Sequence, residues 1–196
     1  MNVEQSRDSP LEERRLLQLA AAGDARAFRS IVQAYASTVA GVITSMLGPG
    51  DDADDAGQET FIRLMRALPT FRGDSVLRTF VTRIAMNVSL DALARRKRDL
   101  RFVSLGSTED TGSGDVHSVD RTADEEEDQR ARAQLVQRAV DSLDGKHRAV
   151  VVMRLLEQRS TKESAQLLGI PEGTVMSRLT RAMQKLEHIL RPVLDR

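Results

Sequence analysis

The chain of 196 residues contains no cysteine and no tryptophan, and its formal net charge is zero. Without cysteine it can form no disulfide, no thiolate zinc site and no thiol-based redox sensor. No run of alternating β-branched residues indicates a strand. The N-terminus lacks the apolar core of a signal peptide, and no apolar run approaches the length of a membrane span. These absences favour a cytoplasmic protein built from helices.

The zero net charge hides a strong segregation of charge along the chain. Residues 106–128 contain nine acidic side chains and a single arginine, whereas a basic block is formed by Arg95, Arg96, Lys97, Arg98 and Arg101. Attraction to phosphate depends on such local patches rather than on the sum over the chain. The acidic stretch is also rich in Ser, Gly and Thr and has almost nothing to bury, which predicts a flexible linker.

Apolar residues recur at helical spacing on both sides of this stretch. The pattern predicts two helices within residues 11–47, separated at Gly23 with Asp24 as an N-cap, then helices at 52–68 and 76–98. Three or four further helices are expected after the linker. The sequence therefore predicts an all-α fold of two small helical domains, namely a bundle at 11–100, a flexible acidic linker at 101–127 and a helix-turn-helix domain at 128–194.

The most informative pattern is TKESAQLLGIPEGTVMSRLTR at residues 161–181, which predicts two short helices around a Gly-Ile-Pro-Glu-Gly break. Ala165, four residues before Gly169, suits a close helix crossing followed by a turn. Pro171 prevents the first helix from continuing, and Thr174 is the expected N-cap of the second. One side of the second helix is apolar and comprises Val175, Leu179, Ala182, Met183, Leu186, Ile189 and Leu190.

Another side of this helix carries hydroxyls and cations, at Thr174, Ser177, Arg178, Arg181 and Lys185. One packing face and one polar face are what a reader of the DNA major groove requires. An amphipathic helix with a solvated basic face explains the same periodicity. The Ala-x3-Gly-x5-Val-x3-Leu framework, with the Pro-x-Gly break inside it, favours DNA binding.

Three segments of the chain together resemble the extracytoplasmic-function sigma factors of the bacterial sigma-70 family. They are DADDAGQETFIRLMRAL at 52–68, FRGDSVLRTFVTRIAMN at 71–87 and LDGKHRAVVVMRLLEQRSTKESAQLLGIPEGTVMSRLTRAMQKL at 143–186. The resemblance implies a subunit that binds core RNA polymerase, recognises and melts the promoter −10 element with its first domain, and binds the −35 element with its second.

The first segment resembles the family's docking helix for the clamp helices of the polymerase β′ subunit. Its outward polar side chains are expected to make that contact, fixing register more than adding affinity. A core helix of the first domain accounts for its apolar Phe61 and Leu64. The sequence departs from the family at Ala56-Gly57, and a glycine inside a helix costs about 1 kcal/mol relative to alanine. The expected polymerase contacts are Asp52, Asp55, Gln58, Glu59 and Arg63.

The second segment resembles the family's melting and −10 recognition segment. Strand separation needs a shaped loop that captures an unstacked base. Phe80, where the family often has tryptophan, lies on the apolar stripe and is expected in the core. The basic block either contacts phosphates or forms a solvated helix end that complements the helix dipole. The expected −10 and melting residues are Phe71, Arg72, Asp74, Ser75, Arg83, Asn87, Arg95 and Arg96.

The third segment resembles the −35-binding domain, where Arg178 and Arg181 are the best candidates for base edges or adjacent phosphates. Met176 and Met183 stand where relatives commonly carry Lys or Arg, so weaker and less salt-sensitive −35 binding is expected. Ser164 replaces a usual apolar residue and is expected to thin the packing. The expected −35 residues are Glu172, Thr174, Ser177, Arg178, Arg181 and Lys185.

The sequence offers no nucleophile–base pair and no phosphate-binding glycine loop, and its three histidines share no metal-ligand spacing. We expect no catalytic activity, cofactor, metal or small-molecule substrate. The resemblance implies an anti-sigma factor, commonly membrane-bound, that holds the protein at the inner membrane face. Two alternatives stay open at this point: a stand-alone helix-turn-helix regulator that binds a palindrome without polymerase, and a helical adaptor that binds only proteins.

Overall fold

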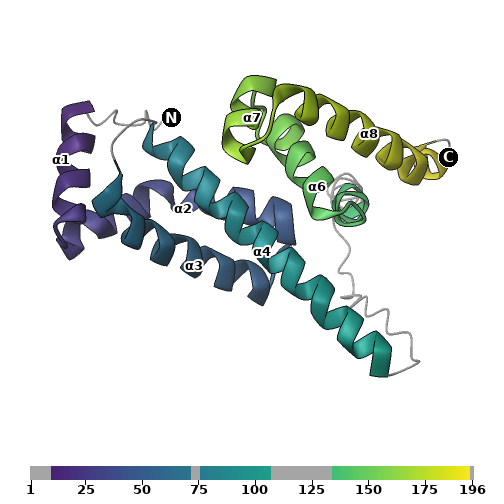
Figure 1. Ribbon diagram of the computed structural model, residues 1–196, viewed down its shortest axis with the longest axis horizontal. Helices are drawn as coiled ribbons and strands as arrows, with labels where there is room; N and C mark the ends of the chain where they lie inside the picture. Colours follow the sequence, from purple (N-terminus) through teal and green to yellow (C-terminus); the bar gives the residue numbers. More distant parts are fainter. Residues whose placement is uncertain (1–9, 72–75, 107–133, 195–196) are drawn as a thin grey trace, which may run out of the picture.

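A computed structural model of the protein describes residues 10–71, 76–106 and 134–194. Within these ranges the regular elements are all helices, which confirms the predicted all-α class (Figure 1). The N-terminal half contains α1 (Pro10–Ala21), α2 (Ala25–Leu47), α3 (Asp51–Ala67), the 3-10 turn η1 (Leu68–Thr70) and α4 (Leu77–Gly106). The C-terminal half contains a helical segment at 134–141, α6 (Gly145–Val151), the π-helical segment η2 (Val152–Leu156), α7 (Thr161–Leu168) and α8 (Glu172–Leu194).

The predicted break between the first two helices is confirmed. Gly23 has φ +93°, a left-handed conformation that glycine adopts without steric cost. Asp24 then caps α2, because its carboxylate accepts hydrogen bonds from the backbone N–H groups of Arg26 at 2.8 Å and Ala27 at 3.0 Å. Those two hydrogen bonds lower the pKa of Asp24. A short local signal thus fixes where this core helix begins.

The core of the N-terminal half lies where α2, α3 and α4 pack together, with α1 against α2. Ile43, Met46 and Leu64 are fully buried there. Tyr35 on α2 donates its hydroxyl to Glu13 of α1 over 3.0 Å. Burial, followed by that hydrogen bond to a carboxylate, raises the pKa of Tyr35 to about 12. The phenol therefore stays a neutral donor and joins the first two helices at physiological pH.

Helix α2 corrects one expectation from the sequence. Over an 18-residue window its mean hydropathy reaches 1.3, so by length and composition alone it matches a membrane span. The core helix of a soluble protein meets the same criterion, and α2 supplies six buried residues to the core. Its apolar content is explained by helices packing on several of its sides.

Helix α4 is longer than predicted, because it continues to Gly106 instead of ending at residue 98. The basic block therefore lies inside the helix, and the first six residues of the predicted linker, 101–106, are helical. Between residues 77 and 105 there is no glycine or proline, so nothing in the local sequence interrupts the helix before Gly106. The remaining predicted linker residues, 107–127, lie outside the described residues.

The C-terminal half has two small apolar clusters of its own. One joins the helical segment at 134–141 to α8 through Ala139, Val140, Ala182 and neighbours, and the other joins Val150, Ala165 and Val175. Further apolar residues of α6, η2 and α7 instead pack into the core of the N-terminal half. In Figure 1, α6 and α7 lie beside α4, and α8 extends away from it.

Candidate functional site

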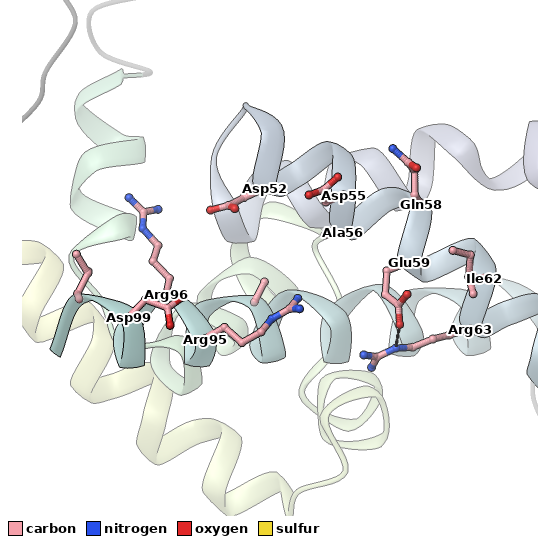
Figure 2. A pocket seen from close by; sticks show the side chains of 12 residues that line it. Asp52, Asp55, Ala56, Gln58, Glu59, Ile62, Arg63, Arg95, Arg96 and Asp99 are labelled. Carbon is pink, nitrogen blue, oxygen red and sulfur yellow. Dashed lines mark hydrogen bonds and ion pairs between the residues drawn. The ribbon is translucent and has the colours of Figure 1, made fainter. Parts of the chain in front are cut away.

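A groove of about 660 Å³ lies between α3 and α4 (Figure 2). All five predicted polymerase contacts line it: Asp52, Asp55, Gln58, Glu59 and Arg63. Arg95 and Arg96 of α4 line it from the other side, so the groove has an acidic wall and a basic wall. The two arginines that the sequence assigned to the −10 element therefore share one surface with the predicted docking residues.

Arg63, which lines this groove, links α3 to α4 through two hydrogen bonds. Its Nε donates to Glu59 Oε1 at 2.7 Å, and its Nη1 donates to Asp91 Oδ2 on α4 at 2.9 Å. The hydrogen bonds to Glu59 and then to Asp91 raise the pKa of the Arg63 guanidinium. The geometry makes Arg63 a positioning residue for α3. Sequence reasoning missed Asp91, because no local pattern links residues 28 apart on different helices.

The predicted −10 and melting residues do not gather in one place within the described ranges. Phe71 packs against Phe80 with ring centroids 4.8 Å apart, and both rings also pack on the core, as expected for Phe80. Asn87 is exposed on α4. Arg95 lies eight residues further along the helix, about 12 Å at 1.5 Å per residue. Arg72, Asp74 and Ser75 lie outside the described residues.

The predicted helix-turn-helix is present in α7 and α8. Ser160 and Glu163 form a capping box at the start of α7, with Glu163 N–H donating to Ser160 Oγ at 3.2 Å and Ser160 N–H donating to Glu163 Oε2 at 2.8 Å. Gly169 ends the helix in the left-handed region at φ +64° and donates its N–H to Ala165. Ala165 and Val175 meet in one small apolar cluster, which fixes the crossing of the two helices.

The predicted N-cap of the second helix is wrong. Helix α8 begins at Glu172, and the N–H groups of Thr174 and Val175 donate to the carbonyl of Pro171 at 2.9 and 3.1 Å. Thr174 is thus inside the first turn. Proline is favoured at a helix start because its missing N–H would have no intrahelical partner there. Helix α8 consequently starts two residues before the predicted N-cap, Thr174.

The six predicted −35 residues all lie on α8, and four of them are exposed: Glu172, Ser177, Arg181 and Lys185. Lys185 Nζ donates to the carbonyl of Ser142 at 2.7 Å, so its ammonium group holds α8 against the end of the segment at 134–141. Arg178 and Arg181 make no hydrogen bond or ion pair with other described residues. Both guanidinium groups therefore remain available to a ligand.

Two departures from the family pattern have visible results. Ser164 is fully buried, and its hydroxyl has no hydrogen-bond partner among the described residues. A buried hydroxyl without a partner costs free energy because it has lost its hydrogen bonds to water. Met183, expected on the packing side of α8, is 44% exposed and lines an apolar groove with Val136, Leu155 and Leu186.

The histidines are distributed as single residues. His147 Nδ1 lies 2.6 Å from Asp144 Oδ2 at the start of α6, His188 is exposed, and His117 lies outside the described residues. In the part of the chain that the structure describes, no three His, Asp or Glu side chains are grouped as metal ligands.

Comparisons with known proteins cover both halves. Residues 31–99 match sigma-70 region 2, and residues 133–186 match sigma-70 region 4. The chain is 31% identical to the RNA polymerase sigma-H factor of Pseudomonas aeruginosa over 189 residues, covering 93% of this chain and 96% of the relative. It is 32% identical to the ECF RNA polymerase sigma-E factor of Escherichia coli (strain K12) over 179 residues, covering 89% and 92%.

Two solved structures share the fold. CnrH, in complex with the cytosolic domain of CnrY, has a TM-score of 0.62 at 28% identity and covers 92% of this chain and 97% of CnrH. The sigma factor RpoE of Bartonella quintana, in complex with the anti-sigma factor NepR, has a TM-score of 0.62 at 20% identity and covers 84% and 96%.

Two helical domains, a helix-turn-helix and a charged groove on the preceding domain define a transcription initiation factor of the sigma-70 type. The chain belongs to the extracytoplasmic-function group of the sigma-70 family. It is a sigma factor that binds core RNA polymerase and directs promoter recognition, and it acts in the cytoplasm. The family match spans both halves, which neither a stand-alone regulator nor a protein-binding adaptor explains.

Proposed function

We propose which of the described residues bind core polymerase and which bind the promoter. Asp52, Asp55, Gln58 and Glu59 contact the β′ clamp helices of polymerase, and Arg63 positions them through Glu59 and Asp91. This assignment rests on the α3–α4 groove, where these side chains share one open surface. Arg95 and Arg96 on its opposite wall are placed either for an acidic patch of polymerase or for promoter phosphates. We assign no catalytic activity to the chain itself.

The −10 element is contacted from the start of α4, by Arg83 and Asn87 together with Phe71, Arg72, Asp74 and Ser75 of the preceding segment. The −35 element is read by α8. The observation that carries this second assignment is the free guanidinium groups of Arg178 and Arg181 on the polar side of a helix-turn-helix recognition helix. Thr174, Ser177 and Glu172 supply hydrogen bonds next to them, and Lys185 helps to hold the helix in place.

The experiment is run-off transcription with core polymerase on a set of promoter fragments. Arg178→Ala should reduce transcription from promoters with an intact −35 element about tenfold to a hundredfold, since one good base contact is worth about 1–3 kcal/mol. Asp55→Arg combined with Glu59→Arg should reduce transcription on every promoter equally. The exposed Arg29→Ala on α2 is the control and should change neither. Core-independent binding to a palindrome would contradict the assignment.

An anti-sigma factor is the proposed regulator, held at the membrane and releasing the protein on a signal. Support comes from the family and from CnrH, which was solved with the cytosolic domain of CnrY bound. A detergent extract of membranes from the native cell should inhibit run-off transcription, and an excess of the purified chain should restore it. Inhibition that excess chain does not relieve would count against this regulator.

A further inference from the structure

The recognition helix α8 carries an exposed apolar side chain among its polar ones. Met176 lies one turn after the start of the helix at Glu172, and it is 50% exposed. Val175, one position earlier, is fully buried, so Met176 lies at the edge where the packing side of α8 meets its open side. Helix α8 packs on α6 and α7 and extends away from the N-terminal half (Figure 1). This edge therefore faces outward.

The surroundings of Met176 orient its side chain and leave it uncovered. Helical side chains lean toward the N-terminus, so Met176 extends over the turn that contains Gly173. An added Cβ at Gly173 would meet nothing within 4 Å, so this turn is open to solvent. Thr161, the first residue of α7, donates its hydroxyl to Met176 Sδ over 3.7 Å. The thioether is thus held from one side while its other side stays accessible to a ligand.

Thr180 extends this apolar edge by one turn. It is exposed, and its hydroxyl donates to the carbonyl of Met176 over 3.1 Å. Because the hydroxyl proton is used within the helix, Thr180 offers a ligand its methyl group and no further donor. Met176 and Thr180 together form a small apolar strip on the open side of α8. Around the helix, Ser177 lies between this strip and Arg181, so apolar and cationic groups face the same ligand side by side.

The edges of the bases in the DNA major groove offer one apolar group, the C5 methyl of thymine. The other groups on those edges are donors and acceptors, and covering them with an apolar side chain costs free energy because they lose their hydrogen bonds to water. We propose that Met176 and Thr180 contact the methyl group of a thymine in the −35 element and are specificity-determining residues for promoter choice. The inference rests on the proposed role of α8 at the −35 element.

Replacing thymine by deoxyuridine tests the contact directly, because deoxyuridine lacks only the C5 methyl group and pairs with adenine in the same way. Each thymine of the −35 element, on either strand, is replaced in turn on a promoter fragment that the full-length protein transcribes with core polymerase. At one position the run-off transcript at limiting protein should fall about fourfold, which corresponds to returning one buried methyl-sized group to water. Replacements at the other positions should change the transcript little.

Variants then assign the effect to the strip. Met176→Ala should transcribe the thymine and deoxyuridine templates equally, and Thr180→Ser, which keeps the hydroxyl and removes the methyl group, should narrow the difference. Both positions are exposed, so the melting temperature should not change. Met183→Ala is the matched control, because it removes an exposed methionine about two turns further along α8, where the side chain lines an apolar groove. It should keep the full preference for thymine.

No deoxyuridine effect at any −35 position would overturn the proposal, and so would an effect that Met176→Ala leaves unchanged. Arg178→Ala, run on the same templates, separates the two levels of the assignment. If this variant transcribes every fragment like the unmodified protein, the role of α8 at the −35 element fails. If it loses activity while thymine and deoxyuridine templates are equivalent for the unmodified protein, only the role of Met176 and Thr180 fails.

Discussion

The N-terminal half surrounds its core with helices of 23, 17 and 30 residues, whereas the C-terminal half supports its recognition helix with α6 and α7, of seven and eight residues. Isolated helices of that length are unstable in water. The short helices of the C-terminal half are therefore stabilised by their N-caps and by packing on the N-terminal half, in whose core Val152 and Met153 are buried. The comparison shows that the recognition helix α8 can be held in place by short helices that would not be stable on their own.

The functional side chains of the two halves also differ. Beside the α3–α4 groove, Arg63 pairs with both Glu59 and Asp91 and thereby joins the two helices. On α8, Arg178 and Arg181 are unpaired among the described residues. If the proposed assignments hold, the docking surface for polymerase is preorganised by its own ion pairs, and the surface for DNA keeps its cations free for phosphates and bases.

The largest expected effect comes from removing Arg148, one of two arginines that, among the described residues, donate from one half to the other. Arg148 is 6% exposed, donates to the carbonyls of Met46, Asp141 and Leu143, and pairs with the Asp141 carboxylate at 3.1 Å. Burial, partly offset by Asp141, lowers the pKa of its guanidinium. Arg148→Met leaves three carbonyls without their donor and should lower the free energy of unfolding by about 3 kcal/mol.

Urea denaturation followed by circular dichroism measures this loss, with the exposed Arg138→Met as the matched control. The C-terminal half should unfold at lower urea than the N-terminal half in the variant. A single transition with an unchanged midpoint would mean that the C-terminal half is equally stable without Arg148.

A smaller effect is expected at the N-cap of α6. Asp144 accepts hydrogen bonds from the N–H groups of Lys146 and His147. Burial raises its pKa, but the hydrogen bonds from His147 and Lys146 and the attraction of His147 outweigh it, so the pKa is lowered. The carboxylate therefore stabilises the fold above the unfolded-state pKa of 3.8, and this contribution disappears as the pH falls through the lower folded-state value.

Asp144→Ala should cost about 1 kcal/mol at pH 7 and much less at pH 2, as measured by urea denaturation at both pH values. Asp144→Asn is the matched variant, because asparagine caps helices as well as aspartate but does not titrate. It should keep most of the stability at pH 7 and remove the part of the pH dependence due to this residue. An equal loss for both substitutions would indicate that charge, and not the cap, matters here.

The smallest expected effect is a gain in the N-terminal half. Gly57 lies inside α3, and an added Cβ would meet nothing within 4 Å. Gly57→Ala should raise the free energy of unfolding by about 0.5–1 kcal/mol and leave the groove intact, since Gly57 does not line it. Thermal melting measures the gain. The counterpart Gly48→Ala, at φ +80°, should destabilise the protein, and a loss at both positions would show that Gly57 serves a close contact.

Features set by neighbours in the chain were predictable from the sequence. The break at Gly23 with its Asp24 cap, the turn at Gly169 and the apolar pattern that makes Val175 a core residue depend on residues within a few positions. The end of α4 and the start of α8 were misplaced, since a basic block resembled a helix end and Thr174 resembled a cap. Both errors concern boundaries, where several nearby residues satisfy the same rule.

The sequence by itself determined the helices and the helix-turn-helix, because backbone conformation and amphipathic spacing are local properties, and it supplied the candidate residues for polymerase and DNA. Only the tertiary structure decided which of those residues are free. Arg63 is held by Asp91, Arg83 by Gln166 and Arg148 by Met46, across separations of 28, 83 and 102 residues. No sequence periodicity predicts such pairs, because each guanidinium bonds to an acceptor that only the tertiary fold brings within hydrogen-bond distance.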